Sequence, residues 1–185
     1  MPQSNRPRIK PIDAVLQEPL KSRMAKIFPA DMPSPSLYRG VAKNESLFID
    51  MIDMGYITST GLMDRRTIPH RIRELLILRN CVQAVNEYEF NLHVETISEK
   101  VGLTKLEIED LKNSEINHEL WPVAEATLIA MTDELVHSIS LPDNAFYSLS
   151  NHYSEAELIE MVQLFGVYTT VAMMVDLIRP EPDPY

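Results

Sequence analysis

Residues 68–111 read IPHRIRELLILRNCVQAVNEYEFNLHVETISEKVGLTKLEIEDL, and this stretch decides the fold. Pro69 stands where the first turn of a helix begins, and apolar residues follow it at helical spacing. Asn86 then precedes Glu89 by three residues, which is the spacing of a helix cap with a carboxylate at the third helical position. We therefore expect one helix after Pro69 and a second that starts at Asn86 and stops near Gly102.

Helix-start signals continue on both sides of this stretch: Thr104 with Glu107, Pro122, Pro142, and Ser154 with Glu157. Before it, a first helix is expected from about Leu37 to Met54. No stretch alternates apolar and polar residues with period two. The sequence predicts an all-α fold, a single helical domain of about seven helices over residues 36–179.

Residues 1–35 differ from the rest in composition. They hold seven of the 13 prolines, and six basic against three acidic side chains, so they carry +3 while the remaining residues carry −13 of the net −10. Proline removes a backbone donor and restricts the residue before it, so an extended basic arm is expected, lying across an acidic body or a neighbouring subunit. Residues 180–185 form a C-terminal tail.

The overall composition narrows the class of protein. Of 185 residues only Cys81 is a cysteine, which excludes an intramolecular disulfide, a Cys-x-x-Cys pair and a multi-cysteine metal site. The net charge of −10 disfavours nucleic-acid binding, and no apolar signal segment follows the first basic residues. We expect a cytoplasmic protein without a nucleic-acid partner, in which Cys81 is an inert core thiol.

The run from Met161 to Ile178 is apolar nearly all round. It is short for a membrane span and contains Asp176, so no membrane insertion is expected. A helix buried on most faces fits better, partly against another subunit because a 21.2 kDa chain has little interior. The central helix of a monomer is the alternative.

Candidate chemistry lies on the two helices of the opening stretch. Glu74 shares a helix face with Leu78 and Cys81, so a carboxylate falls on the buried stripe and needs a partner, for which Arg71 is one candidate. Glu89 and His93 are four residues apart on the next helix, an arrangement that suits a proton relay.

The distances of Glu74 and His93 from the turn between the two helices, taken along the helix axes, differ by only about 7 Å. Side chains can span that offset, so Glu74, Glu89 and His93 are expected to converge.

Each of these residues has a structural alternative. Glu89 completes the cap begun by Asn86, and a single histidine is more often a hydrogen-bonded core residue than a catalyst. Two carboxylates and one histidine are conceivable metal ligands, but without a second histidine at helical spacing we expect no metal and no cofactor. Arg79, inside an apolar run, would either bind a substrate carboxylate or pair with an acid on a neighbouring helix.

Residues 68–111 resemble the carboxymuconolactone decarboxylase and alkylhydroperoxidase D-like superfamily. The resemblance rests on the Arg-x-Arg-Glu opening, the Glu-Tyr-Glu before His93, and the Gly-Leu-Thr with the acids after it, and it continues more weakly over residues 36–179. It implies an all-helical fold that assembles as a homotrimer or hexamer. The alkylhydroperoxidase branch uses a Glu, two cysteines three residues apart and a His four residues later; here Glu74, Asn86, Glu89 and His93 occupy that spacing.

Both cysteine positions are therefore replaced, and peroxidase chemistry lacks its reactive thiols. The cysteine-less decarboxylase branch is more similar, and it implies cofactor-independent proton transfer on a small carboxylated or lactone substrate. In that interpretation His93 transfers the proton, Glu89 orients it and Glu74 is a second acid or base. Arg71 or Arg79 would hold the substrate carboxylate, and Tyr88 would donate a hydrogen bond. The alternatives are a non-catalytic helical oligomer that binds a small molecule or partner, and a peroxidase working through Cys81 alone.

Overall fold

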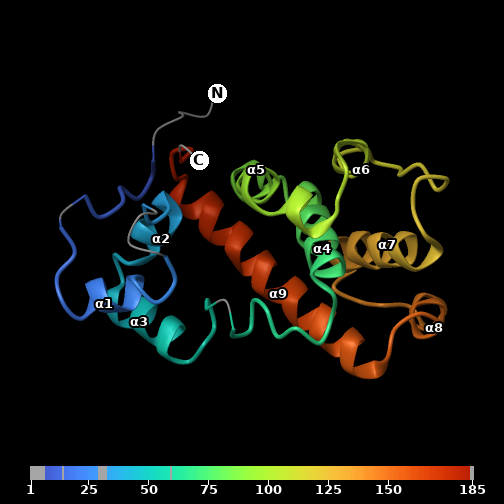
Figure 1. Cartoon of the computed structure of the whole chain (residues 1–185), viewed down its shortest axis with the longest axis horizontal. Coiled ribbons are helices and arrows are strands. Elements are labelled where there is room, and N and C mark those ends of the chain that lie inside the picture. The colour runs from blue at the N-terminus through green and yellow to red at the C-terminus, as the bar shows by residue number, and fades with distance from the viewer. Residues whose placement is uncertain (1–6, 14, 29–32, 59, 184–185) are drawn as a thin grey trace. The chain divides into compact units, whose positions relative to one another are not determined.

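The computed structural model describes residues 7–13, 15–28, 33–58 and 60–183. Within those ranges it contains nine α-helices, one 3-10 helix and no strand, so the all-α prediction is confirmed (Figure 1). The helices outnumber the seven or so expected, partly because the helix expected over residues 37–54 is two helices. The chain divides into two compact units, one up to residue 65 together with the residues from 173 onward, the other over residues 66–172.

The first unit contains α1 (Leu20–Met24), α2 (Ser36–Val41), α3 (Glu45–Asp53) and the last residues of α9 (Glu155–Ile178). Its apolar core consists of Leu20, Met24, Ala42, Phe48, Ile52 and Ile57. The expectation of an extended arm is therefore wrong for α1. Leu20 and Met24 lie four residues apart on one helix face, and their burial outweighs the surrounding prolines.

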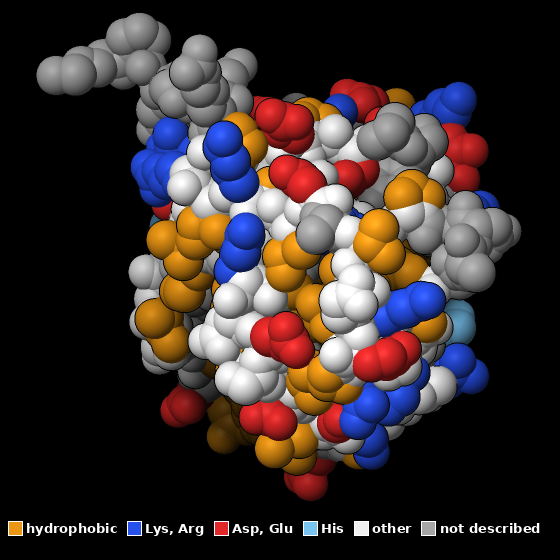
Figure 2. Space-filling model, turned by 90° about the vertical axis from the view of Figure 1, so that its left-hand side faces the viewer, with side chains coloured by type: hydrophobic (Ala, Val, Ile, Leu, Met, Phe, Trp, Pro, Cys, Tyr) orange, Lys and Arg blue, Asp and Glu red, His pale blue; other side chains and the backbone are white. Residues whose placement is uncertain are grey.

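Basic side chains of the N-terminal segment pair with acids of the same unit. Arg8 Nη1 lies 3.6 Å from Asp176 Oδ2, and Asp53 receives Arg23 at 3.1 Å and Lys26 at 2.9 Å. The hydrogen bonds from Lys26 and Arg23 lower the pKa of the Asp53 carboxyl. On the face that Figure 2 shows, basic and acidic side chains are accordingly intermixed.

The second unit contains α4 (His70–Gln83), α5 (Glu87–Thr96), the 3-10 helix η1 (Ser98–Val101), α6 (Lys105–Asp110), α7 (Val123–Ser138), α8 (Asp143–Ser150) and α9 as far as residue 172. Helix α4 packs against α5, η1 and α7. Every residue from Glu74 to Cys81 is at most 1% exposed. Because neighbours surround α4 on all sides, α4 is the central helix of this unit.

Three polar side chains of α4 lie inside this core: Glu74, Arg79 and Asn80. A buried polar group costs free energy unless it is hydrogen-bonded, so each one needs a partner on a neighbouring helix. Asn80 Nδ2 donates to Thr169 Oγ1 on α9 at 3.1 Å, and Arg79 Nη2 donates to Asp133 Oδ2 on α7 at 2.7 Å. Glu74 meets α5. The polar residues of α4 thus fix three different helices around it.

The predicted helix starts are confirmed where the caps form. The Asn86 side chain accepts from the Glu89 backbone N–H at 3.2 Å, and Thr104 and Glu107 make a reciprocal capping box. The helix expected to run to Gly102 ends at Thr96 and the chain continues as η1. Gly102 then adopts φ of 92°, which ends the segment in a conformation that favours glycine.

Helix α9 is, within the described ranges, the one helix long and apolar enough to cross a membrane by length and composition. A third of its most apolar window, 33%, is buried in the chain. Ile159 is 72% exposed and Val162 is 45% exposed. Burial on most faces is therefore not reached within one copy of the chain, and the enclosed helical stretch of this unit is residues 74–81 of α4.

Candidate functional site

His93 on α5 and Glu74 on α4 form a buried dyad. His93 Nδ1 lies 2.9 Å from Glu74 Oε2 and 3.1 Å from Oε1, and Ser98 Oγ donates to Glu74 Oε1 at 2.7 Å. Glu74 is 0% exposed and His93 is 4% exposed. The packing of α4 against α5 and η1 brings the three side chains together. The convergence of Glu74 with His93, expected from helix geometry, is thus observed.

The surroundings of Glu74 favour its ionised form. Burial acts to raise the pKa of this carboxyl, but the charge and hydrogen bond of His93, the Ser98 hydroxyl and the Arg73 charge outweigh it, and the net pKa is lowered. An ionised carboxylate only accepts hydrogen bonds, so His93 Nδ1 carries a hydrogen and donates it. The other ring nitrogen, Nε2, is the atom left for proton transfer.

A tyrosine lies on the Nε2 side of the imidazole. Tyr168 Oη, from α9, is 3.2 Å from His93 Nε2, and Arg73 Nη2 donates to Tyr168 Oη at 3.3 Å. With His93 neutral and protonated at Nδ1, the Tyr168 hydroxyl donates to Nε2. A continuous path then runs from Arg73 through Tyr168 and His93 to Glu74.

Sequence reasoning missed Tyr168, Arg73 and Ser98. One signal was present: a tyrosine inside an apolar helix needs a partner for its hydroxyl when buried.

Glu89 has a different place from the one expected. Its Oε2 lies 3.9 Å from His93 Nε2, which is beyond hydrogen-bond distance. Glu74, not Glu89, therefore orients the imidazole, while Glu89 is a buried carboxylate on the Nε2 side. Tyr88 is half-buried on α5, and five residues before His93 place it about 140° round the helix from the imidazole.

Arg71 does not pair with Glu74. Its Nε and Nη2 donate to Glu125 at 2.8 Å each, Nη2 also donates to Glu107 at 2.5 Å, and Nη1 donates to the Gly102 carbonyl oxygen. The hydrogen bonds to Glu125 and then Glu107 raise the pKa of Arg71 above its ordinary value. This guanidinium joins α4 to α6 and α7.

Arg79 is 1% exposed and is also occupied. Its Nε donates to Asp133 at 2.6 Å, and its Nη1 donates to the carbonyl oxygens of Leu111 at 2.7 Å and Asn113 at 2.8 Å. The sequence predicted two alternative roles for Arg79, and the structure shows the ion pair with an acid on a neighbouring helix. The donors of Arg71 and Arg79 point at protein acceptors, and the structure offers neither guanidinium to a substrate carboxylate.

Cys81 is buried beside the dyad. Burial raises the pKa of its thiol, and the carboxylates of Glu89 and Glu74 raise it further. The thiolate needed for peroxide chemistry is thus disfavoured at this position. In the part of the chain that the structure describes, no group of three or more His, Cys, Asp or Glu side chains is placed to hold a metal ion.

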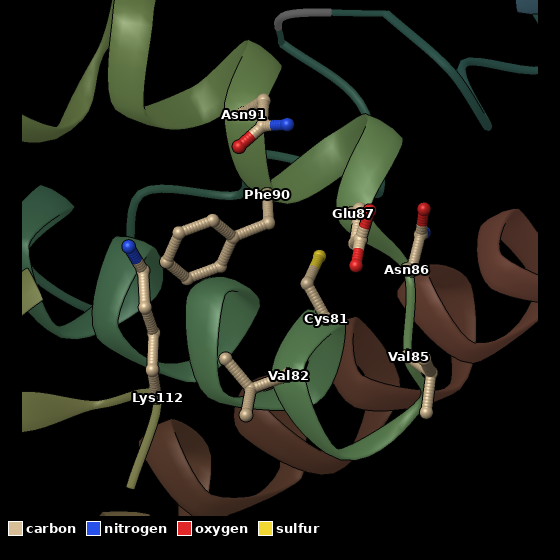
Figure 3. Close-up of a pocket in the computed structure, with 8 residues that line it drawn as sticks. All are labelled: Cys81, Val82, Val85, Asn86, Glu87, Phe90, Asn91 and Lys112. Atoms are coloured by element: carbon tan, nitrogen blue, oxygen red, sulfur yellow. The ribbon is translucent and has the colours of Figure 1, made fainter. Parts of the chain in front are cut away.

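The cavities of this unit include two of small-molecule size. One, of about 390 Å³, lies beside the turn between α4 and α5 and is bounded by Cys81, Phe90 and Lys112 among others (Figure 3). The second, of about 580 Å³, lies between α7 and α8 and is bounded by Trp121, Met131 and Ala145 among others.

No family model and no curated protein matches the chain. Solved structures do. The debrominase Bmp8 matches over 97% of this chain and 94% of its own, at 15% identity and a TM-score of 0.74. A cysteine-to-alanine variant of Bmp8 in complex with 2,3,4-tribromopyrrole matches over 95% and 91%, at 15% identity and a TM-score of 0.73.

A protein of unknown function from Agrobacterium tumefaciens, described as a candidate antioxidant defence protein AhpD, matches over 78% of this chain and 97% of its own, at 19% identity and a TM-score of 0.67. Both proteins are matched over nine-tenths or more of their own length. At these identities the likeness concerns the fold. It agrees with the superfamily resemblance of residues 68–111, and the chain has the AhpD-like all-α fold.

Proposed function

We propose that this protein is a cofactor-independent acid–base enzyme in which His93 Nε2 transfers a proton on a small carboxylated or lactone substrate. The observation that supports it is that both ring nitrogens of His93 have a polar partner. The Glu74 carboxylate holds Nδ1 at 2.9 Å, and the Tyr168 hydroxyl lies 3.2 Å from Nε2. A carboxylate behind an imidazole fixes its tautomer and stabilises the charged ring that forms during proton transfer.

For a decarboxylation the step balances without a redox partner. The bond between a substrate carbon and its carboxylate breaks, its electron pair moves into an adjoining conjugated carbonyl, and carbon dioxide leaves. His93, neutral with its hydrogen on Nδ1, takes a proton from solvent at Nε2 and gives that proton to the substrate carbon, which returns the ring to its neutral form. One proton is consumed for each carbon dioxide released. Glu89, 3.9 Å from Nε2, is the second carboxylate on the reacting side.

The debrominase of the same fold supports a substrate of ring size. That protein is known in complex with 2,3,4-tribromopyrrole, a small five-membered ring.

The test uses His93→Gln on a panel of small lactone and keto carboxylates in deuterated water. Carbon dioxide release and deuterium incorporation into the product are followed by NMR. The variant should turn over about a hundredfold to ten-thousandfold more slowly than the unmodified protein. Cys81→Ala is the control and should keep the full rate. Turnover by His93→Gln at the unmodified rate, or of no panel member by the unmodified protein, would refute the proposal.

The burial of the dyad favours one second candidate, a non-catalytic helical protein that binds a small molecule or partner. With Glu74 at 0% and His93 at 4% exposure, the pair also serves as a structural tie between α4 and α5. This candidate predicts that His93→Gln lowers the melting temperature and changes no rate. Thermal melts run beside the turnover measurements on the same variants separate the two functions.

A further inference from the structure

The cavity beside the α4–α5 turn has the size of a small-molecule site. Its volume of about 390 Å³ lies at the lower end of the range for such sites, roughly 300 to 1,000 Å³. Val82 and Phe90 supply apolar wall, and Cys81 lies at its inner side. In the view of Figure 3 the Phe90 ring stands between Lys112 and Cys81. One ring can therefore pack against Phe90 inside this space.

A cation stands at one end of the cavity. Lys112 Nζ lies 5.4 Å from the centroid of the Phe90 ring and 2.6 Å from Glu109 Oε1. An ammonium group has three donors, and Glu109 uses one. The Lys112 side chain is 46% exposed, so an anion in the cavity can reach it.

The other polar side chains that line the cavity restrict the charge and the hydrogen-bonding groups of the ligand. Glu87 also borders the cavity and opposes a second negative charge near it. Asn86 borders it as well; its Oδ1 accepts from the Glu89 N–H, while its buried Nδ2 has no hydrogen-bond partner among the described residues. In the view of Figure 3 Asn86 and Lys112 lie on opposite sides of Phe90, so the Asn86 amide marks the end of the cavity away from the cation.

We propose that this cavity binds a small aromatic monocarboxylate, with its ring against Phe90 and Val82 and its carboxylate on Lys112. A phosphate or nucleotide fits less well, because the single ammonium is opposed by Glu87. His93 and Glu74 do not line this cavity, so the site goes beyond the proposed function and does not depend on it.

Benzoate is the probe. Its binding is followed by titration in ¹H–¹⁵N NMR spectra, including the side-chain amide of Asn86, which should shift when an aromatic ring enters the cavity that Asn86 borders. Lys112→Met keeps the apolar stem and removes the charge, and it should weaken binding at least about tenfold. Glu109→Gln frees the ammonium and should tighten binding severalfold. Lys105→Met is the matched control, since Lys105 is 87% exposed on the same segment; it should leave the affinity within about twofold.

Equal binding of benzoate and uncharged benzyl alcohol, or unchanged affinity in Lys112→Met, would overturn the proposal. Benzoate shifts in Asn86 that vanish in Lys112→Met and persist in Lys105→Met would support it. The proposed function is tested apart from this, because His93→Gln should bind benzoate as the unmodified protein does. Binding without any turnover would refute the function and keep the site.

Discussion

His93 Nδ1 lies 2.9 Å from Glu74 Oε2, and this bond joins two helices through residues 19 positions apart in the chain. The same contact orients the imidazole and holds α5 against α4. Under the proposed function, proton transfer and stability share this pair of atoms, so each variant needs both a turnover measurement and an unfolding measurement.

Tyr168→Phe isolates the Nε2 side of the imidazole. Removing the hydroxyl deletes the contact at 3.2 Å while the ring stays in place, so we expect turnover to fall about tenfold to a hundredfold and the free energy of unfolding to fall by about 1 kcal/mol. Turnover and denaturant unfolding are measured together. Tyr147→Phe, at a position 66% exposed, is the control. A full rate in Tyr168→Phe would remove Tyr168 from the mechanism.

Glu74→Gln should change how the free energy of unfolding depends on pH in the acid range. The pKa of Glu74 is lowered on folding, so the folded state binds this proton less readily than the unfolded chain. The stability it contributes is therefore complete above the ordinary value of 4.5 and is lost as the pH falls below that value through the lowered pKa.

The unmodified protein should lose more unfolding free energy between about pH 7 and about pH 3 than Glu74→Gln does. Unfolding by urea at each pH checks this, with Glu95→Gln on the exposed face of α5 as the control. Equal slopes for all three proteins would contradict the ionised state of Glu74.

Arg79→Met should destabilise the fold by about 3 kcal/mol, because Asp133 loses its ion pair and the Leu111 carbonyl oxygen loses its Arg79 donor. Arg79→Lys should recover less than half of that loss, since an ammonium cannot reproduce the fork. Denaturant unfolding measures both, and Arg8→Met, at a side chain 48% exposed, should change little. Unmodified stability with lost turnover would instead make Arg79 a substrate-binding residue.

Cys81 should behave as an inert thiol. Its raised pKa and burial predict that iodoacetamide modifies it about a hundredfold more slowly in the folded than in the denatured protein. Cys81→Ala should leave peroxide consumption unchanged. Loss of peroxide consumption in that variant would revive a peroxidase working through a single cysteine.

Self-association stays a prediction that solution measurements decide. The exposed apolar side chains of α9, Ile159 and Val162, are the surface we expect to be covered in a homotrimer or hexamer. Sedimentation should show the oligomer, and Ile159→Lys should shift it toward the monomer. A monomeric unmodified protein would contradict this.

The local part of the structure was predictable from the sequence. Caps at Asn86 and Thr104 and the apolar spacing of α4 depend on neighbours within one turn, and the rise per residue of a helix was enough to bring Glu74 near His93. Helix α1 was not foreseen, because the burial of Leu20 against α3 overrides the extended preference of a proline-rich segment.

Contacts between distant segments decided the rest. Whether Glu74 or Glu89 holds the imidazole depends on how α4 and α5 cross, which spacing along one helix does not fix. Tyr168 reaches His93 across 75 residues of chain. The acceptors of Arg71 and Arg79 likewise lie far along the chain, on α6, on α7 and in the segments directly before and after α6, and no local sequence pattern identifies them.

The buried stretch of α4, residues 74–81, determines under which conditions the Glu74–His93 dyad comes apart. Backbone amides enclosed on all sides exchange with solvent only when the surrounding unit opens as a whole. Glu74 begins this stretch, and its partner on α5 is held by the same packing. The dyad therefore has no melting transition of its own, and it disassembles in the same cooperative step as the unit that encloses it.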